Sequence, residues 1–128
     1  MPKKNKTTYG LSDGSRMTGD EIDRKVVKAK EKYLEDFVDL HGYIFCERSK
    51  RSDKPVDRSH IISVRICKQT GRSELSFSKW NLEFLTREEH LKLENWANKT
   101  RELWFEMRKE GMSFEQFEDW NKIDLGGV

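Results

Sequence analysis

Two short β-prone segments and the helix that follows them constrain the fold of this 128-residue chain most strongly. Residues 56–63 and 80–85 each contain a short run of β-branched or aromatic side chains, and a long polar stretch with Gly71 separates them. Thr86 then precedes Glu89 by three residues, which is the capping-box pattern of a helix N-terminus. The pattern predicts two short strands followed directly by a helix.

Longer helical segments are expected on both sides of this unit. A capping box and apolar residues at helical spacing predict a helix over residues 19–41. The same spacing predicts that the helix beginning at Thr86 reaches Gly111, and Ser113 is placed to cap a last short helix. A short β-rich run is expected at residues 43–46. The expected fold class is therefore α+β.

These segments suggest a division of the chain into four parts. Residues 1–17 combine Lys, Gly, Ser and Thr with almost no apolar spacing, so we expect a disordered basic arm. Residues 18–42 form an N-terminal helix, residues 43–101 the strand and helix core, and residues 102–128 a C-terminal helical extension.

The composition fits one small domain with a locally basic segment. With 34% hydrophobic and 38% charged residues, the chain buries one modest core. The net charge of +2 does not by itself indicate a nucleic-acid partner. Residues 43–72, however, hold eight basic and three acidic residues, a local charge of +5. Such a run is equally typical of a solvated loop.

Cysteine usage and hydropathy bear on the compartment. Cys46 and Cys67 lie far apart in the sequence with no signal peptide before them, which fits reduced thiols in a cytoplasmic protein. No apolar run approaches the roughly 20 residues that span a bilayer. We therefore expect a soluble intracellular protein without a membrane partner.

The residues that suggest chemistry are Ser59-His60-Ile61-Ile62 on the first strand, Asn81 at the start of the second, and His90, nine residues after Asn81. An imidazole with a pKa near ~6.5 is suited to deprotonate water at neutral pH, and a second imidazole can hold a divalent metal. An amide both donates and accepts, so Asn81 can bridge backbone groups of the long loop. Each residue also has a structural interpretation, as a strand histidine, a turn asparagine or an exposed histidine at a helix start.

This combination of His-Ile-Ile, Asn-Leu-x-x-Leu and a final His resembles the HNH endonuclease family over roughly half the chain. The resemblance implies a ββα-metal (His-Me finger) core, with His60 as general base, Asn81 as structural amide and His90 as metal ligand. It implies hydrolysis of DNA, with Mg²⁺ or Mn²⁺, or else Zn²⁺ or Ni²⁺, as cofactor. It also implies a phage or mobile-element protein in the cytoplasm of a bacterial host, with phage packaging or recombination proteins as further partners.

The sequence departs from the family pattern in two places. Many members carry a metal-binding Asp immediately before the first His, where this chain has Ser59; Asp57, two residues earlier, is a substitute ligand on the same strand face. Many relatives also carry a zinc knuckle of two Cys-x-x-Cys pairs. Its positions correspond here to Cys46, Ser49, Thr86 and Glu89. With one thiol of four, no structural zinc site is expected.

Several basic residues are candidates for contacts with the DNA backbone. Arg65, five residues after His60, is placed to contact the scissile phosphate or its leaving group. Five others extend the expected footprint: Arg58, Lys68, Arg72, Lys79 and Arg87. A solvated surface charge is the alternative for each of them.

Two other functional classes stay open at this level. One is an HNH-fold protein that binds nucleic acid or takes part in phage assembly but has lost catalysis with its Asp. The other is a purely helical interaction module in which Asn81 and His90 are incidental. The convergence of His60 and His90 on one site separates the nuclease from this last alternative.

Overall fold

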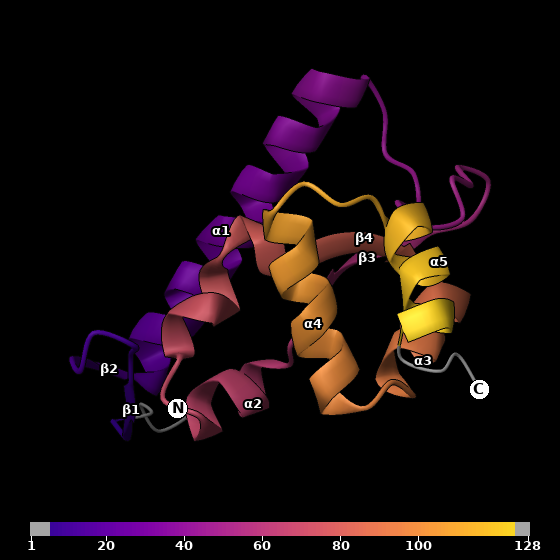
Figure 1. The fold of residues 1–128 in the computed structure, drawn as a ribbon. Coiled ribbons are helices and arrows are strands. Elements are labelled where there is room, and N and C mark those ends of the chain that lie inside the picture. The colour runs from indigo at the N-terminus through magenta and orange to yellow at the C-terminus, as the bar shows by residue number, and fades with distance from the viewer. Residues whose placement is uncertain (1–5, 125–128) are drawn as a thin grey trace.

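The computed structural model describes residues 6–124 and shows an α+β fold, as the sequence predicts (Figure 1). Its helices and strands are β1 (Thr8–Gly10), β2 (Arg16–Thr18), α1 (Gly19–His41), β3 (Val56–His60), α2 (Val64–Gln69), β4 (Leu82–Thr86), α3 (Arg87–Glu94), α4 (Asn98–Lys109) and α5 (Phe114–Asp124). Two 3₁₀ turns, Ser73–Phe77 and Lys79–Asn81, precede β4. No helix in the described part of the chain is long and apolar enough to cross a membrane.

The central unit is an antiparallel hairpin of β3 and β4 followed at once by α3. Val56 pairs with Thr86 at one end of the hairpin and His60 pairs with Leu82 at the other. The Thr86 hydroxyl accepts a hydrogen bond of 3.3 Å from the Glu89 amide, which caps α3 as the capping box predicts. The predicted order of strand, loop, strand and helix is therefore present.

The first strand is shorter than predicted. It ends at His60, because the Ile62 amide bonds to the Asn81 side chain instead of continuing the strand ladder. Ser63 then accepts a 3.2 Å bond from the Ile66 amide and caps α2, so the polar stretch expected as a loop holds a short helix and the two 3₁₀ turns.

The helix predicted from Thr86 to Gly111 is interrupted. It divides into α3 and α4 because Ala97 adopts an extended conformation, with φ −62° and ψ 147°. At the break, Trp96 packs against both buried apolar clusters of the core. The last helix begins as predicted, with the Ser113 hydroxyl accepting a 3.2 Å bond from the Gln116 amide.

The expected disorder of residues 1–17 is wrong for residues 8–17. Residues 8–10 and 16–18 form the antiparallel pair β1–β2, while residues 1–5 lie outside the described residues. The Lys68 ammonium lies 4.7 Å from the centroid of the Tyr9 ring, and the Ser12 hydroxyl bonds to Glu74. Backbone pairing and these polar contacts hold the hairpin, so it needs no periodic apolar side chains.

Residues 43–46 are not a strand either. The Cys46 amide donates to the Arg51 carbonyl at 2.9 Å, and the Lys50 amide donates back to the Cys46 carbonyl at 2.8 Å. Residues 43–46 are therefore irregular, and these two bonds close the turn that follows at residues 47–49.

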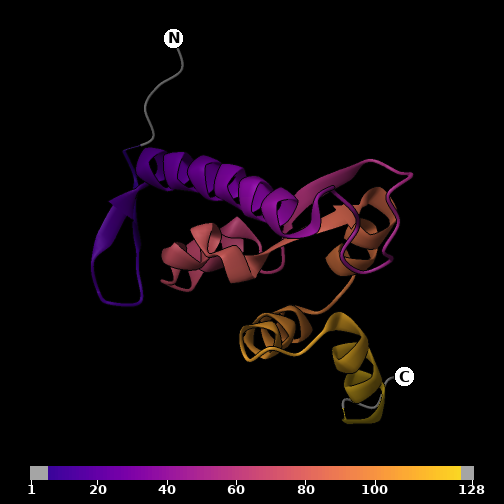
Figure 2. The ribbon, with the colours of Figure 1, turned by 90° about the horizontal axis from the view of Figure 1, so that it is seen from above.

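Helices cover the central hairpin on two sides (Figure 2). Helix α1 lies on one side, and α4 and α5 lie on the other. The main buried cluster joins Ile61 and Ile62 to Trp104, Phe105 and Phe117. The expected boundary between residues 101 and 102 therefore falls inside α4, and the C-terminal helices share the core of the central unit.

Candidate functional site

A groove of about 350 Å³ brings side chains from four helices and β3 together. Both histidines of the predicted site, His60 and His90, line it. Its full lining is Lys30, Asp57, Arg58, Ser59, His60, Ser63, Val64, Arg87, His90, Glu94 and Arg101. His60 and His90, which are 30 positions apart in the sequence, thus lie at one concave surface, as the nuclease hypothesis requires.

His60 is held as a neutral base. Its Nε2 lies 2.8 Å from the Ser76 carbonyl oxygen, and a carbonyl only accepts, so Nε2 carries the proton. The Nδ1 lone pair is then available to take a proton. Burial lowers the pKa of His60 below its usual 6.5, and the charges of Lys30 and Arg101 add to this effect. The imidazole of His60 is therefore neutral at pH 7, with its one proton on Nε2.

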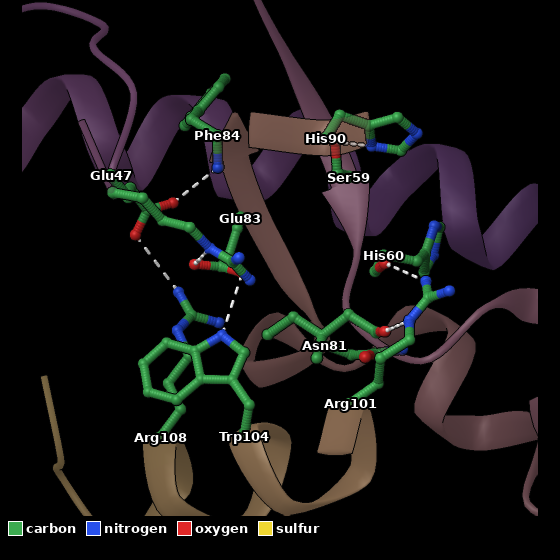
Figure 3. A network of polar contacts seen from close by, with 12 residues as sticks. Glu47, Ser59, His60, Asn81, Glu83, Phe84, His90, Arg101, Trp104 and Arg108 are labelled. Atoms are coloured by element: carbon green, nitrogen blue, oxygen red, sulfur yellow. Dashed lines mark hydrogen bonds and ion pairs between the residues drawn. The ribbon is translucent and has the colours of Figure 1, made fainter. Parts of the chain in front are cut away.

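His90 is oriented by two neighbours. Its Nδ1 lies 2.9 Å from the Ser59 hydroxyl, and its Nε2 lies 2.7 Å from a carboxylate oxygen of Glu94, one helical turn later (Figure 3). Ser59 is only 4% exposed, and its place on β3 directs it toward α3. The Ser59 side chain thus positions His90.

Asn81 bridges the loop as its amide predicts. The fully buried side chain accepts a 2.7 Å bond from the Ile62 amide and donates 3.0 Å bonds to the carbonyls of Ile62 and Leu75. These bonds fix the chain leaving β3 against the 3₁₀ turn that carries Ser76, the partner of His60. Asn81 therefore acts on His60 through the backbone.

Arg65 does not reach the groove, whereas Arg101, which was not predicted, lines it. Arg65 is exposed on α2 and does not line the groove. Arg101, in the first part of α4, donates from Nε to the Ile61 carbonyl at 2.5 Å and from a terminal nitrogen to the His60 carbonyl at 3.2 Å (Figure 3). Sequence reasoning missed Arg101 because no local pattern relates it to the strand 40 residues earlier.

Two of the predicted DNA-backbone contacts belong to the groove. Arg58 and Arg87 line it together with Lys30, and Arg58 also donates a 2.9 Å bond to the Lys30 carbonyl. This bond anchors the strand to α1. The three cations lie in the same concave surface as the histidines.

The other three predicted contacts lie outside the groove. Lys68 stacks on the Tyr9 ring, Arg72 forms an ion pair with Glu102, and Lys79 is exposed on the second 3₁₀ turn. Each has a local role or faces solvent, so these three residues lie apart from the histidines, and their contact with a DNA backbone stays a prediction.

The groove offers few metal-binding groups. No group of three or more His, Cys, Asp or Glu side chains suited to hold a metal occurs among residues 6–121. His90 and Glu94 are adjacent, and the exposed Asp57 lines the same groove. Mg²⁺ commonly binds one or two protein groups and completes its shell with water and substrate phosphates. The donor set therefore fits an ion shared with a phosphate better than a fully protein-bound one.

The four zinc-knuckle positions lie side by side. The Cys46 sulfur accepts a 3.5 Å bond from the Ser49 amide. Burial raises the pKa of Cys46, but hydrogen bonds from the backbone of Ser49, Thr86 and Arg48 outweigh it and lower that pKa. Thr86 in turn caps α3 through the Glu89 amide. A hydrogen-bonded cap thus occupies the place where a Cys-x-x-Cys pair would begin.

Known proteins add no further constraint on this groove. Comparison of the chain with family models, curated proteins and solved structures finds no match. The chemistry has to be inferred from the lining itself, which presents two imidazoles, four cationic side chains and two carboxylates.

Proposed function

We propose that this protein is an HNH-type endonuclease that hydrolyses DNA phosphodiester bonds with the aid of a divalent metal. The observation that carries the proposal is the shared groove of His60, with its fixed neutral tautomer, and His90, with its carboxylate partner. In this proposal β3, β4 and α3 are the two strands and the helix of a ββα-metal core.

In the proposed reaction His60 is the general base. Its Nδ1 takes a proton from a water molecule, the water oxygen bonds to the phosphorus, and the bond from phosphorus to the leaving oxygen breaks, with that oxygen taking a proton from solvent. The lowered pKa of His60 keeps this nitrogen unprotonated at neutral pH. The excess of cationic side chains over carboxylates in the groove favours a bound phosphodiester, which carries a negative charge.

His90 and Glu94 are the proposed metal-binding residues, with Asp57 across the groove as a further carboxylate. The bond to Ser59 fixes the His90 ring. Nε2, which donates to Glu94 in the structure, would hold the ion together with the Glu94 carboxylate in the tautomer whose proton lies on Nδ1 and is donated to the Ser59 hydroxyl. A bound Mg²⁺ or Mn²⁺ supplies charge neutralisation on the phosphate and the leaving oxygen.

The test is nicking of a supercoiled plasmid by the purified chain in Mg²⁺ or Mn²⁺, with EDTA as the control. We expect conversion to open-circular or linear DNA only when the metal is present. Absence of conversion in either metal, with the plasmid still bound, contradicts the nuclease and supports the second function below.

The second function is an HNH-fold protein that binds nucleic acid or takes part in phage assembly without cutting DNA. It is favoured by one observation: the Ser59 hydroxyl, in place of the family's Asp, is engaged with His90. In this case the cationic groove still holds DNA, and binding by fluorescence anisotropy is expected without cleavage.

Metal binding should depend on His90 and Glu94. We expect each of His90→Ala and Glu94→Gln to weaken Mn²⁺ binding by at least about 10-fold, because each removes one of few ligands. Mn²⁺ electron paramagnetic resonance titration, in a His60→Ala background with a short DNA duplex, measures the affinity without cleavage. Glu88→Gln, an exposed carboxylate on α3 outside the groove, is the matched control. Unchanged affinity in both groove variants contradicts the assignment.

The knuckle positions give a test of the proposed core that needs no activity. A triple substitution of Ser49, Thr86 and Glu89 by cysteine, with the native Cys46, is expected to create a tetrahedral site. Zinc at about 1,000 times its Kd should then raise the free energy of unfolding by about 4 kcal/mol, less about 1 kcal/mol for the lost Thr86 cap. Co²⁺ absorption reports the geometry.

The control for this experiment is the same triple variant with Cys46→Ser. It should show a weaker Co²⁺ spectrum and a smaller zinc-dependent stabilisation, since it lacks the fourth thiolate. A triple variant whose Co²⁺ spectrum is octahedral, or absent, argues against the knuckle relationship and against the proposed core.

A further inference from the structure

Arg101 is a cation at the wall of the groove that makes no ion pair within 4 Å among the described residues. Two of its five N–H groups donate to the carbonyls of Ile61 and His60. The other three have no partner among the residues that the structure describes. Burial lowers the pKa of Arg101, and the charge of Glu94 across the same lining only partly offsets this cost, so the cation is less well compensated than one on an open surface. An arginine that served only to donate to backbone carbonyls would not need to hold its charge at a half-buried position in the groove.

The two hydrogen bonds fix where the guanidinium lies. Both acceptors belong to the chain at the end of β3, and one is the carbonyl of His60 itself. Helix α4, which carries Arg101, is fixed independently: Trp104 donates a 3.0 Å bond to Glu83 on β4. The guanidinium therefore keeps a set position relative to the imidazole, whichever way the rest of the groove moves.

The other cations of the groove are held differently. Arg58 is tied to the Lys30 carbonyl on α1, and Arg87 is exposed at the start of α3. Neither has a contact with the backbone of His60 among the described residues. Arg101 is thus the cation best preorganised to act beside the proposed base. Its guanidinium is already oriented by its hydrogen bonds, so no free energy is needed to reorient it during the reaction.

We propose that Arg101 is a catalytic residue that binds the scissile phosphate next to His60. The inference rests on the proposed nuclease function and names the side chain that recognises its substrate. The free edge of the guanidinium donates to non-bridging phosphate oxygens and stabilises the charge that builds up on them as the water attacks. No bond to Arg101 forms or breaks, and the proton from water goes to His60.

The experiment combines a kinetic and a binding measurement on Arg101→Gln. We expect the plasmid cleavage rate to fall by about 10²- to 10³-fold. In a His60→Ala background, the plot of log Kd for a DNA duplex against log salt should become shallower by about one. The second readout separates a phosphate contact from a purely structural role, which leaves the salt slope unchanged. Arg24→Gln, exposed on α1 outside the groove, is the control and should change neither quantity.

A second variant distinguishes loss of the guanidinium from misfolding of the chain. Arg101→Lys keeps the charge, so it should keep the salt slope but not the full cleavage rate, because the planar fork is lost. Added guanidinium at low concentration should partly restore cleavage by Arg101→Ala.

An unchanged salt slope in Arg101→Gln, or cleavage equal to that of the unsubstituted chain, overturns the proposal. An unsubstituted chain that binds but does not cut refutes the nuclease function, while a slope change then still identifies the phosphate contact.

Discussion

Replacement of His60 by alanine is expected to lower the rate of plasmid cleavage by about 10²- to 10⁴-fold with DNA binding preserved. The reason is geometric: the bond from Nε2 to the Ser76 carbonyl leaves Nδ1 of His60 as the base, while the other basic groups of the lining, His90, Glu94 and Asp57, are the proposed metal-binding residues. Gel analysis of single-turnover cleavage measures the rate, and fluorescence anisotropy measures binding.

His41→Ala is the matched control for loss of a histidine. His41 is exposed at the end of α1 and absent from the lining of the groove. Its removal should leave the cleavage rate unchanged. His60→Gln is a second variant that keeps a polar group near Ser76. If either His60 variant cleaves as fast as the unsubstituted chain, His60 is not the general base.

The pH profile of cleavage follows from the same residue. The folded pKa of His60 lies below its usual value, so the neutral base persists through pH 7 and is lost only as the pH falls below 6.5. Below pH 6.5, His60 binds a proton more readily in the unfolded chain than in the folded chain. The free energy of unfolding therefore also declines as the pH falls through this range. The acid limb of kcat/KM should therefore lie below pH 6.5.

Glu83→Ala is expected to reduce the free energy of unfolding by about 3–5 kcal/mol. Glu83 is 1% exposed and accepts bonds from Arg48 at 2.7 and 3.3 Å and from the Trp104 indole at 3.0 Å. The Arg48 guanidinium also lies over the rings of Trp96 and Phe114, 4.7 and 4.4 Å from their centroids. Removing the carboxylate leaves this buried cation without its counter-charge.

A double-variant cycle distinguishes a lost ion pair from a simple cavity. Combining Glu83→Leu with Arg48→Met removes both charges and keeps apolar volume, so the double variant should be more stable than Glu83→Ala alone. Urea unfolding followed by tryptophan fluorescence measures each free energy. A loss below about 1 kcal/mol in Glu83→Ala, the usual value for an exposed pair, contradicts the assigned burial.

The same network links stability to the candidate site. Glu83 holds α4 through Trp104 (Figure 3), and a partly buried hydrogen bond of 2.8 Å connects Arg108 of α4 to Tyr33 of α1. Burial raises the pKa of Glu47, which accepts a 2.7 Å bond from the Phe84 amide beside them. These polar groups set the position of α4, and with it the position of Arg101.

Interactions close along the chain were predictable. Thr18, Thr86 and Ser113 cap their helices through bonds to an amide three residues later, so the sequence predicted all three starts. The two strands and the helix after them were likewise predicted in order, as was the bridging role of Asn81. Strand ends and the break near Ala97 were not, because packing of distant side chains decides them.

The sequence by itself therefore determined the order of the elements, the helix starts and the pair of histidines as candidate site residues, since local hydrogen bonds and residue chemistry suffice for these. Only the tertiary structure placed Arg101 instead of Arg65 in the groove, buried Glu83 with Arg48, and folded residues 8–17 into a hairpin. These outcomes depend on contacts between residues 6 to 62 positions apart, which spacing along the chain does not encode.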